Sequence, residues 1–285
     1  MDGLFNIYKE ANMTSFDVVA KVRKIMNTRT VGHTGTLDPN ATGVLVVAVG
    51  KATKAISYME NDDKIYIAEL TLGIKTDTED IWGEVLSKKE LKDFDLNEDK
   101  IKETIKSFIG KQLQVPPMYS ALKVNGKKLY ELAREGKEVK RVAREIEIFD
   151  ISDVFINDNK VSFKVHCSKG TYIRTLCKDI GDKLGCGATM SSLERVKAGK
   201  FLKENSVRLE ELEKEPNKYL IEIETVFEKF PIIKLDDEEA IKYINGVKIN
   251  KTELEDGLYR IYIEGKFYGI CKIESGILKS EKKIS

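Results

Sequence analysis

The chain has 285 residues, 41% of them hydrophobic, which suits one large domain or one domain with a small appendage. Its 48 basic and 47 acidic residues give a net charge of +1, so the global charge does not indicate a nucleic-acid partner. Four cysteines without a Cys-x-x-Cys pair argue against a metal site and a disulfide framework, and the apolar runs are too short for a signal peptide or a membrane span, so we expect a metal-free cytoplasmic protein.

Strands and helices alternate in the first part of the chain. Thr14 and Asp17 form a capping box, and apolar residues then recur at helical spacing as far as Met26. Residues 44–49 are apolar on both faces, as in a buried strand. The elements predicted here are, in chain order, a strand at 4–8, a helix from Thr14, a strand at 44–49, a short helix at 53–59, a strand at 65–72 and a helix at 91–108.

The second part of the chain begins with a change of composition. Residues 120–145 hold eight basic residues and only four acidic ones. Clean alternation predicts a half-buried strand at 161–168, and an apolar stripe predicts a helix at 171–184 that is ended by glycines. From Pro231 onward, short β-rich runs alternate with Gly-containing turns, which predicts a small β-rich unit.

The loop between the first helix and the buried strand is the candidate reactive segment. Asp38-Pro39 alone is most often a plain turn, because proline pushes the preceding residue out of helical geometry. Three features favour a functional loop over a plain turn. The loop carries three glycines that allow close backbone approach, it holds His33, one of only two histidines, and it runs directly into the strand at 44–49. Asp38 is therefore expected beside the core rather than on a distant tip.

Several ordered motifs resemble those of the bacterial tRNA pseudouridine-55 synthases of the TruB type. The resemblance covers nearly the whole chain. The matching segments are the loop 31–43 with Asp38, Lys64-Ile65-Tyr66, the acidic loop 76–83, Met118-Tyr119-Ser120-Ala121-Leu122-Lys123, Gly126-Lys127-Lys128-Leu129-Tyr130, the segment 166–176 with Arg174, Gly185-Cys186-Gly187-Ala188 and Leu193-Glu194-Arg195.

The resemblance implies an α+β chain with the pseudouridine synthase fold, in which helices and loops flank a mixed, largely antiparallel central sheet. The catalytic domain is expected at residues 1–228, with a basic RNA-clasping insertion at about 112–148. Residues 229–285 are expected to form a small PUA-like RNA-binding barrel. The implied reaction is the isomerisation of uridine 55 in the T-arm loop of tRNA to pseudouridine, with tRNA as the partner, no cofactor, no membrane and no obligatory protein partner.

The resemblance also implies a role for each candidate residue. Asp38 is the catalytic nucleophile or base, Arg174 is its partner, and Tyr66 stacks on the uracil, with proton removal from C5 as a further possibility. The expected substrate-binding residues are His33, Tyr66, Tyr172, Leu193 and Asp80, and the expected backbone clamp is Lys123, Lys127 and Lys128.

Elementary chemistry makes these roles reasonable, although each residue also has an ordinary interpretation. A guanidinium can hold a carboxylate through two hydrogen bonds and favours its ionised form. A lone arginine off the apolar stripe of a helix is nevertheless more often a solvated surface residue. Tyr66 and Tyr172 could equally be packing residues, Leu193 a core residue and the basic stretch a solvated surface. His166, on the polar face of its strand, is expected to be structural.

One segment departs from the family pattern. The family usually opens with Lys-Pro-x-Gly before a Thr/Ser-Ser pair, but here Glu10 and Asn12 replace the proline and the glycine. Because asparagine tolerates a positive φ, the turn can survive.

Two alternatives differ from a stand-alone tRNA enzyme. One is the catalytic subunit of an RNA-guided pseudouridylation complex, although the long insertion between Gln112 and Ile148 favours the stand-alone enzyme. The other is a non-catalytic protein that binds or folds tRNA, which would need no carboxylate at position 38.

Overall fold

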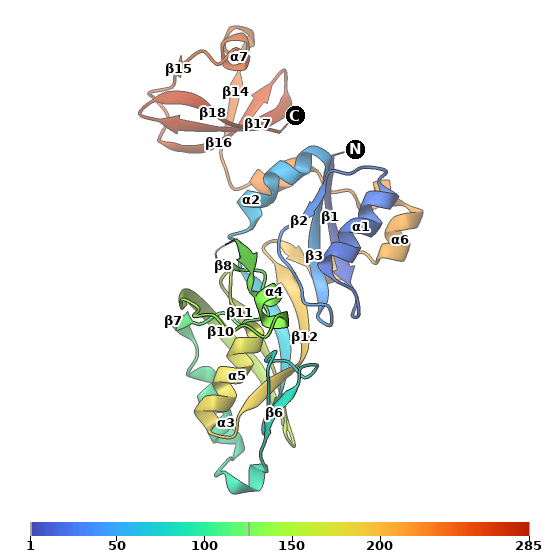
Figure 1. Ribbon diagram of the computed structural model, residues 1–285. Helices are drawn as coiled ribbons and strands as arrows, with labels where there is room; N and C mark the ends of the chain where they lie inside the picture. Colours follow the sequence, from blue (N-terminus) through green and yellow to red (C-terminus); the bar gives the residue numbers. More distant parts are fainter. Residues whose placement is uncertain (1, 125, 285) are drawn as a thin grey trace.

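The computed structural model describes residues 2–124 and 126–284 and is built around a nine-stranded sheet (Figure 1). The strand order is β1-β3-β12-β4-β11-β10-β7, with β2 beside β3 and β13 beside β12. The strands are β1 (Gly3–Lys9), β2 (Val31–His33), β3 (Thr42–Val49), β4 (Lys64–Leu72), β7 (Gly110–Gln114), β10 (Arg144–Asn157), β11 (Lys160–Cys167), β12 (Ala188–Ala198) and β13 (Phe201–Leu202). Strand β12 runs parallel to β3, and the other pairs are antiparallel, which confirms the expected mixed sheet.

Helices and two small hairpins surround this sheet. The helices of this part are α1 (Ser15–Ile25), α2 (Ile56–Met59), α3 (Glu98–Lys106), α4 (Leu129–Arg134), α5 (Ile173–Leu184) and α6 (Leu209–Lys214). The hairpins are β5 (Ile74–Thr76) with β6 (Val85–Lys88), and β8 (Lys123–Val124) with β9 (Lys127–Lys128). Within the described residues, no helix is both long and apolar enough to cross a membrane.

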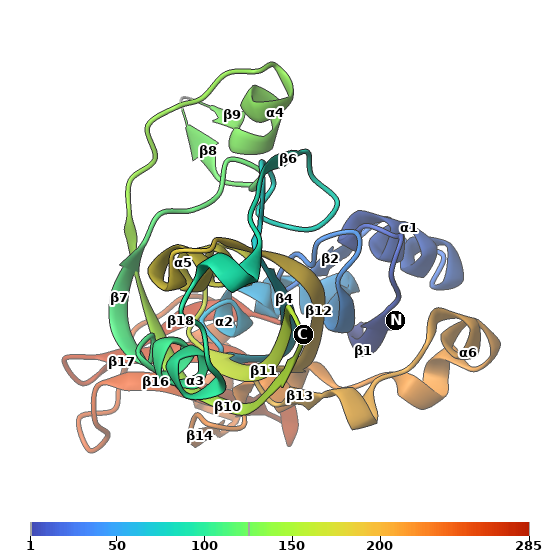
Figure 2. The same ribbon diagram turned by 90° about the horizontal axis from the view of Figure 1, so that it is seen from below.

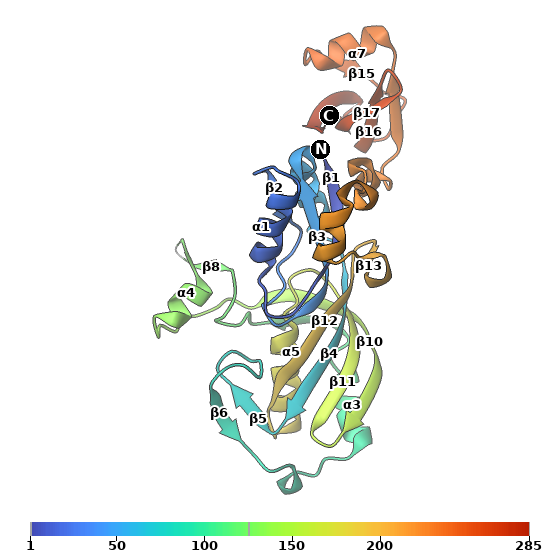
Figure 3. The same ribbon diagram turned by 90° about the vertical axis from the view of Figure 1, so that its right-hand side faces the viewer.

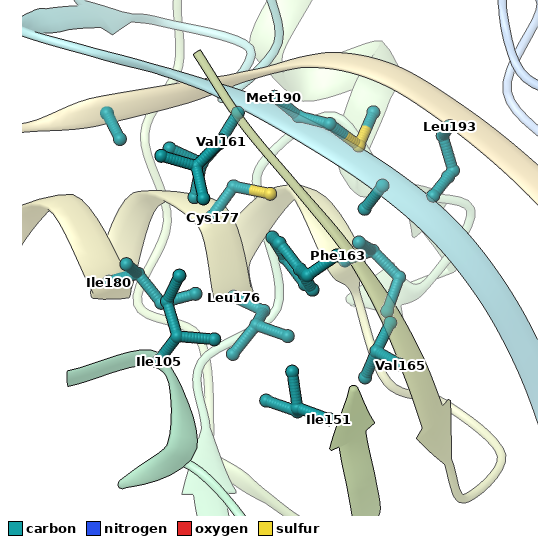
Figure 4. Packing of buried hydrophobic residues seen from close by; sticks show 14 of the residues in the cluster. Ile105, Ile151, Val161, Phe163, Val165, Leu176, Cys177, Ile180, Met190 and Leu193 are labelled. Atoms are coloured by element: carbon teal, nitrogen blue, oxygen red, sulfur yellow. The ribbon is translucent and has the colours of Figure 1, made fainter. Parts of the chain in front are cut away.

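The main hydrophobic core lies between the sheet and helices α3 and α5 (Figure 4). Phe163 and Val165 of β11 point into it, as the alternation of that strand predicts, and Leu176 and Ile180 enter the same core from α5. Burying a large apolar side chain contributes about 1.5–3 kcal/mol. This packing fixes the first turn of α5, which carries Arg174, against the sheet.

The helix expected at 91–108 is much shorter than predicted. Residues Leu91–Asp93 form a single 3₁₀ turn, Phe94 is extended, and α3 begins only after Asn97. The side chain of Asn97 accepts a hydrogen bond from the backbone N–H of Lys100 (2.9 Å), so it caps a new helix rather than continuing an old one.

The C-terminal part of the chain is β-rich, as predicted, and lies at one end of the molecule (Figure 1). Its sheet order is β14-β16-β17-β18-β15, with α7 as an unpredicted helix. The elements are β14 (Ile232–Leu235), α7 (Asp237–Ile244), β15 (Ile249–Asn250), β16 (Gly257–Ile263), β17 (Lys266–Glu274) and β18 (Ile277–Lys283). Buried Phe227 joins a cluster with Val46 of the central sheet and Ile270 of this unit, so the two parts share a core. The boundary between residues 228 and 229 stays a prediction.

Candidate active site

Asp38 lies in the loop between β2 and β3, and this loop is anchored at several points. The Ser15 hydroxyl, at the start of α1, bonds both backbone groups of Leu37, at 2.8 and 3.1 Å. At the far end of the loop, Gly43 has φ +103, and a side chain there would collide with the backbone of Arg195. The sequence therefore needs glycine where β3 meets β12, and the strand holds the loop against the core.

Arg174 holds Asp38 through two contacts. Its Nε lies 3.0 Å from Oδ2 of Asp38, and its Nη2 lies 3.4 Å from Oδ1. The arginine side chain is 6% exposed, whereas that of Asp38 is 37% exposed. A buried guanidinium thus presents a carboxylate that solvent or a large substrate can reach. The predicted pairing of Asp38 with Arg174 is thus present in the structure.

The remaining donors of Arg174 are also occupied. Nη1 donates to the carbonyl oxygen of Thr78 (3.0 Å) and lies 3.6 Å from Asp80, while Nη2 donates to the carbonyl oxygen of Tyr119 (2.8 Å). The surface interpretation of this arginine is therefore wrong. It stands in the first turn of α5, where side chains point back past the helix N-terminus and toward the loops.

The aromatic and apolar residues expected around a uracil gather near Asp38. Tyr66 and Leu193 lie on β4 and β12 and pack in one cluster with Leu37, the neighbour of Asp38. Burial raises the pKa of Tyr66, against an opposing effect of Arg195. Burial likewise raises the pKa of Tyr172, which lies directly before α5. Both phenols are thus protonated at neutral pH, which supports stacking for Tyr66 better than proton removal.

The two histidines occupy different environments. His33 ends β2, where it is half-buried, and burial lowers its pKa, assisted by the positive charge of Arg195. Its ring is therefore neutral at pH 7 and can stack without a charge. His166 lies on β11, bonds Asp63 and contacts the ring of Phe149 at 4.9 Å between centroids. That position suits the structural role expected for it.

The lysines expected to clamp RNA lie on the hairpin β8–β9. This hairpin and α4 project from the body of the protein, above the hairpin β5–β6 in Figure 2. Lys123 is exposed, Lys127 lies 3.8 Å from Glu135, and Lys128 donates to the Tyr130 hydroxyl at 3.3 Å. Lys127 and Lys128 thus already have contacts within the insertion. Figure 3 shows the insertion, the β5–β6 hairpin and α1 on the same side of the molecule.

Arg195 is a buried residue of this site whose role the sequence did not reveal. Its Nε donates to the carbonyl oxygen of Val44 (2.7 Å) and its Nη2 to that of Gly35 (3.1 Å), so it ties together both ends of the Asp38 loop. The side chain is 2% exposed. The only signal in the sequence was its place in the Leu193-Glu194-Arg195 motif.

Lys9 is the second such residue, and it supports the atypical turn before α1. Its fully buried amine donates to the carbonyl oxygens of Glu10 (2.9 Å), Met13 (2.6 Å) and Pro39 (3.0 Å). Asn12 takes φ +62, as predicted for a residue that replaces glycine. The turn therefore survives, fastened by Lys9 to the residue that follows Asp38.

Replacing Lys9 with methionine should change how stability depends on pH. Burial lowers the pKa of Lys9 from 10.5 to about 8, so between these values the unfolded chain keeps a proton that the folded chain has released. Stability of the wild type should therefore rise with pH in this window, by up to about 3 kcal/mol relative to Lys9→Met. Urea unfolding of both proteins at about pH 8 and about pH 10 measures the difference. A difference that does not vary with pH would contradict the prediction.

Within residues 2–124 and 126–284, no group of three or more His, Cys, Asp or Glu side chains is arranged to hold a metal ion. The site as described brings together three kinds of protein group. These are a reachable carboxylate, a buried arginine that orients it, and an adjoining aromatic and apolar surface.

Sequence and structure comparisons identify relatives. The profile of the TruB family pseudouridylate synthase N-terminal domain matches residues 23–173, and that of the tRNA pseudouridylate synthase B C-terminal domain matches residues 174–226. Two proteins named tRNA pseudouridine synthase B are similar to nearly the whole chain. The protein from Clostridium novyi (strain NT) is 48% identical over 99% of both chains, and that from Clostridium kluyveri is 51% identical over 95% of both.

Solved structures show the same fold. A chain in a Cbf5-Nop10-Gar1 complex has a TM-score of 0.73 at 27% identity, and one in an H/ACA RNP bound to a substrate RNA containing 2'-deoxyuridine has 0.72 at 25%. Each comparison covers 99% of this chain and 85% of the other. The pseudouridine synthase fold expected from the motifs is thereby confirmed, and this chain belongs to the TruB family of pseudouridylate synthases.

Proposed function

We propose that this protein is a tRNA pseudouridine synthase that isomerises uridine 55 in the T-arm loop, without a cofactor or an obligatory protein partner. The relatives that cover nearly its whole length are named tRNA pseudouridine synthase B, which supports the tRNA substrate. The observation that carries the proposal is the reachable carboxylate of Asp38, held by the buried guanidinium of Arg174.

The reaction needs a base that has left the RNA stack. The C1′–N1 bond of the uridine breaks, the uracil turns, C1′ joins C5, and the proton lost from C5 is balanced by protonation of N1. These atoms are inaccessible in a folded T-arm, so we infer that the nucleotide is flipped toward Asp38. Asp38 then acts as the nucleophile or as the base that starts the reaction. In either role it must be ionised, and the guanidinium of Arg174 holds it in place.

The neighbouring residues would receive the flipped nucleotide. Tyr66 stacks on the uracil, with Tyr172 and Leu193 lining the pocket, and the neutral ring of His33 fills the gap left in the RNA stack. Asp80 would contribute to substrate binding through Arg174, because its carboxylate faces that guanidinium. These assignments rest on the family resemblance, and those of Tyr66 and Leu193 are supported by their packing in the same cluster as Leu37.

More distant surfaces would hold the rest of the T-arm. The basic insertion on β8, β9 and α4 contacts the phosphate backbone, and the C-terminal PUA-like sheet provides a second RNA-binding surface. We also place the protein in the cytoplasm, since the four cysteines Cys167, Cys177, Cys186 and Cys271 are buried free thiols, as suits a reducing compartment.

The direct test is to incubate the purified protein with unmodified tRNA transcript, in the absence of any other RNA, and to map pseudouridine at every position. We expect a single product at position 55. A product at another uridine would contradict the site, and the absence of any product would contradict the activity.

The same test addresses the guided alternative. The solved structures that share this fold come from complexes described as H/ACA RNP and Cbf5-Nop10-Gar1. The relatives of about twice the sequence identity are nevertheless named tRNA pseudouridine synthase B, which favours the stand-alone enzyme. Modification that appeared only when a guide RNA was added would reverse this preference.

Replacing both Lys127 and Lys128 with alanine should weaken tRNA binding and reduce its salt dependence. Each lost phosphate contact lowers the slope of log K against log salt by about 0.7–0.9. Filter binding over a range of salt concentrations measures the slope. Alanine at the exposed Lys92 and Lys106, outside the insertion, removes the same charge and serves as the control. An equal slope for both pairs would rule out the clamp.

A further inference from the structure

Glu79 has an unusual conformation directly beside the arginine network. It lies in the acidic loop between β5 and β6, and its φ of +64 is one that side chains other than those of Gly, Asn and Asp rarely adopt. Such a backbone conformation is strained, and it persists only where the surrounding structure holds it in place. Backbone bonds on both sides hold it here, from Glu79 N–H to Thr76 (3.4 Å) and from Met190 N–H to Glu79 (3.1 Å).

The side chain of Glu79 makes a specific contact with the helix that carries Arg174. Its carboxylate accepts a hydrogen bond of 2.6 Å from the hydroxyl of Thr175, the next residue along α5. Burial raises the pKa of Glu79, and the positive charges of Lys178 and Arg174 partly oppose that rise. A half-buried carboxylate is held here against its desolvation cost, so the contact is a built feature rather than a loose surface contact.

The two residues that flank Glu79 both engage Arg174. The Thr78 carbonyl accepts from Nη1 at 3.0 Å, and the Asp80 carboxylate lies 3.6 Å from the same nitrogen. Three consecutive loop residues therefore meet two consecutive helix residues. The left-handed turn at Glu79 lets its side chain reach Thr175, while the carbonyl of Thr78 and the carboxylate of Asp80 face Arg174.

We propose that Glu79 is a positioning residue, which fastens the acidic loop to Thr175 and thereby fixes the guanidinium of Arg174 on Asp38. This role rests on the proposed function only for its effect on catalysis. The Glu79–Thr175 hydrogen bond, called the latch below, is a property of the folded protein and can be measured without substrate. Glu79 touches no reacting atom, so its loss should alter the orientation of Asp38 and not the binding of RNA.

The kinetic test compares Glu79→Ala, Thr175→Val and the double variant with the wild type on tRNA transcript. Each single change should lower kcat about 10- to 100-fold and leave KM within about threefold, because misplaced catalytic groups are costly. The double variant should be no slower than the worse single one, since both remove the same bond. Glu79→Gln keeps an acceptor for Thr175 and should retain most of kcat. Alanine at exposed Glu90 is the matched control.

A second measurement is independent of activity. The Nε proton of Arg174 is bonded to Asp38, and its exchange with solvent, followed by NMR, should quicken at least about tenfold in Glu79→Ala and remain slow in Glu79→Gln. Unchanged exchange in Glu79→Ala would overturn the latch, whether or not the wild type modifies tRNA. Faster exchange together with an inactive wild type would keep the latch and reject the proposed function instead. Fully additive kinetic losses would also overturn it.

Discussion

Replacing Asp38 with asparagine should abolish pseudouridine formation, by at least about 10⁴-fold, while tRNA binding stays within about threefold of the wild type. Asparagine has nearly the same shape as aspartate, but its amide is neither a nucleophile nor a base at neutral pH. The RNA-binding surfaces proposed on the insertion and the C-terminal sheet are not changed. Product should be measured by mapping pseudouridine in tRNA transcript, and affinity by filter binding at a fixed salt concentration.

The same variant separates catalysis from a purely structural role in tRNA folding. Arg174 keeps the carboxylate of Asp80 and the carbonyl oxygens of Thr78 and Tyr119 as partners, so the loop should stay in place. Asp99→Asn, on the exposed first turn of α3, removes the same charge and should have full activity. Pseudouridine from Asp38→Asn would reject the assignment of Asp38. Loss of tRNA binding in parallel with loss of product would show that the change disturbs the RNA surface as well.

Local sequence patterns predicted much of the fold, whereas the centre of the site did not follow from them. The capping box of Thr14 and Asp17, the alternation in β11 and the apolar stripe of α5 all concern residues that are close in sequence, and all are confirmed. The Asp38–Arg174 pair joins residues 136 positions apart. It followed from the ordered motifs of the family and not from any local pattern.

The features that the sequence did not predict depend on long-range contacts or on irregular local structure. Arg195 and Lys9 donate to backbone carbonyl groups. No pattern of side chains in the sequence predicts which carbonyl group will accept such a hydrogen bond. Strand β12 has bulges beside Ser192 and Lys197, so its alternation is broken although it occupies the middle of the sheet. Helix α7 lies inside a β-rich stretch and has three acidic residues in its first turn. Its existence depends on the capping side chain of Asp236 and on burial of one face.

Replacing Arg174 should be the second most damaging change, and the two informative variants are lysine and methionine. Lysine keeps the charge, but it is a single point of contact that cannot serve Asp38, Thr78 and Tyr119 together. We expect Arg174→Lys to lose about 10²- to 10³-fold in kcat with little change in KM, because bidentate orientation of the carboxylate is lost. Single-turnover kinetics on tRNA transcript measures this.

Arg174→Met should also destabilise the protein, and the effect should depend on pH. Two carbonyl groups lose their donor, at about 1–3 kcal/mol each if they remain buried. Burial raises the pKa of Asp80, and Arg174 opposes that rise, so removal of the arginine should move this pKa higher still. A carboxyl whose folded pKa is raised binds more protons when folded than when unfolded, and stability then falls as pH rises. The loss of unfolding free energy should therefore be largest at neutral pH and should shrink under acidic conditions, as the folded Asp80 takes up a proton. Urea unfolding of wild type and Arg174→Met at neutral and mildly acidic pH tests this, and a loss that did not shrink on acidification would mean that the pKa of Asp80 does not depend on Arg174.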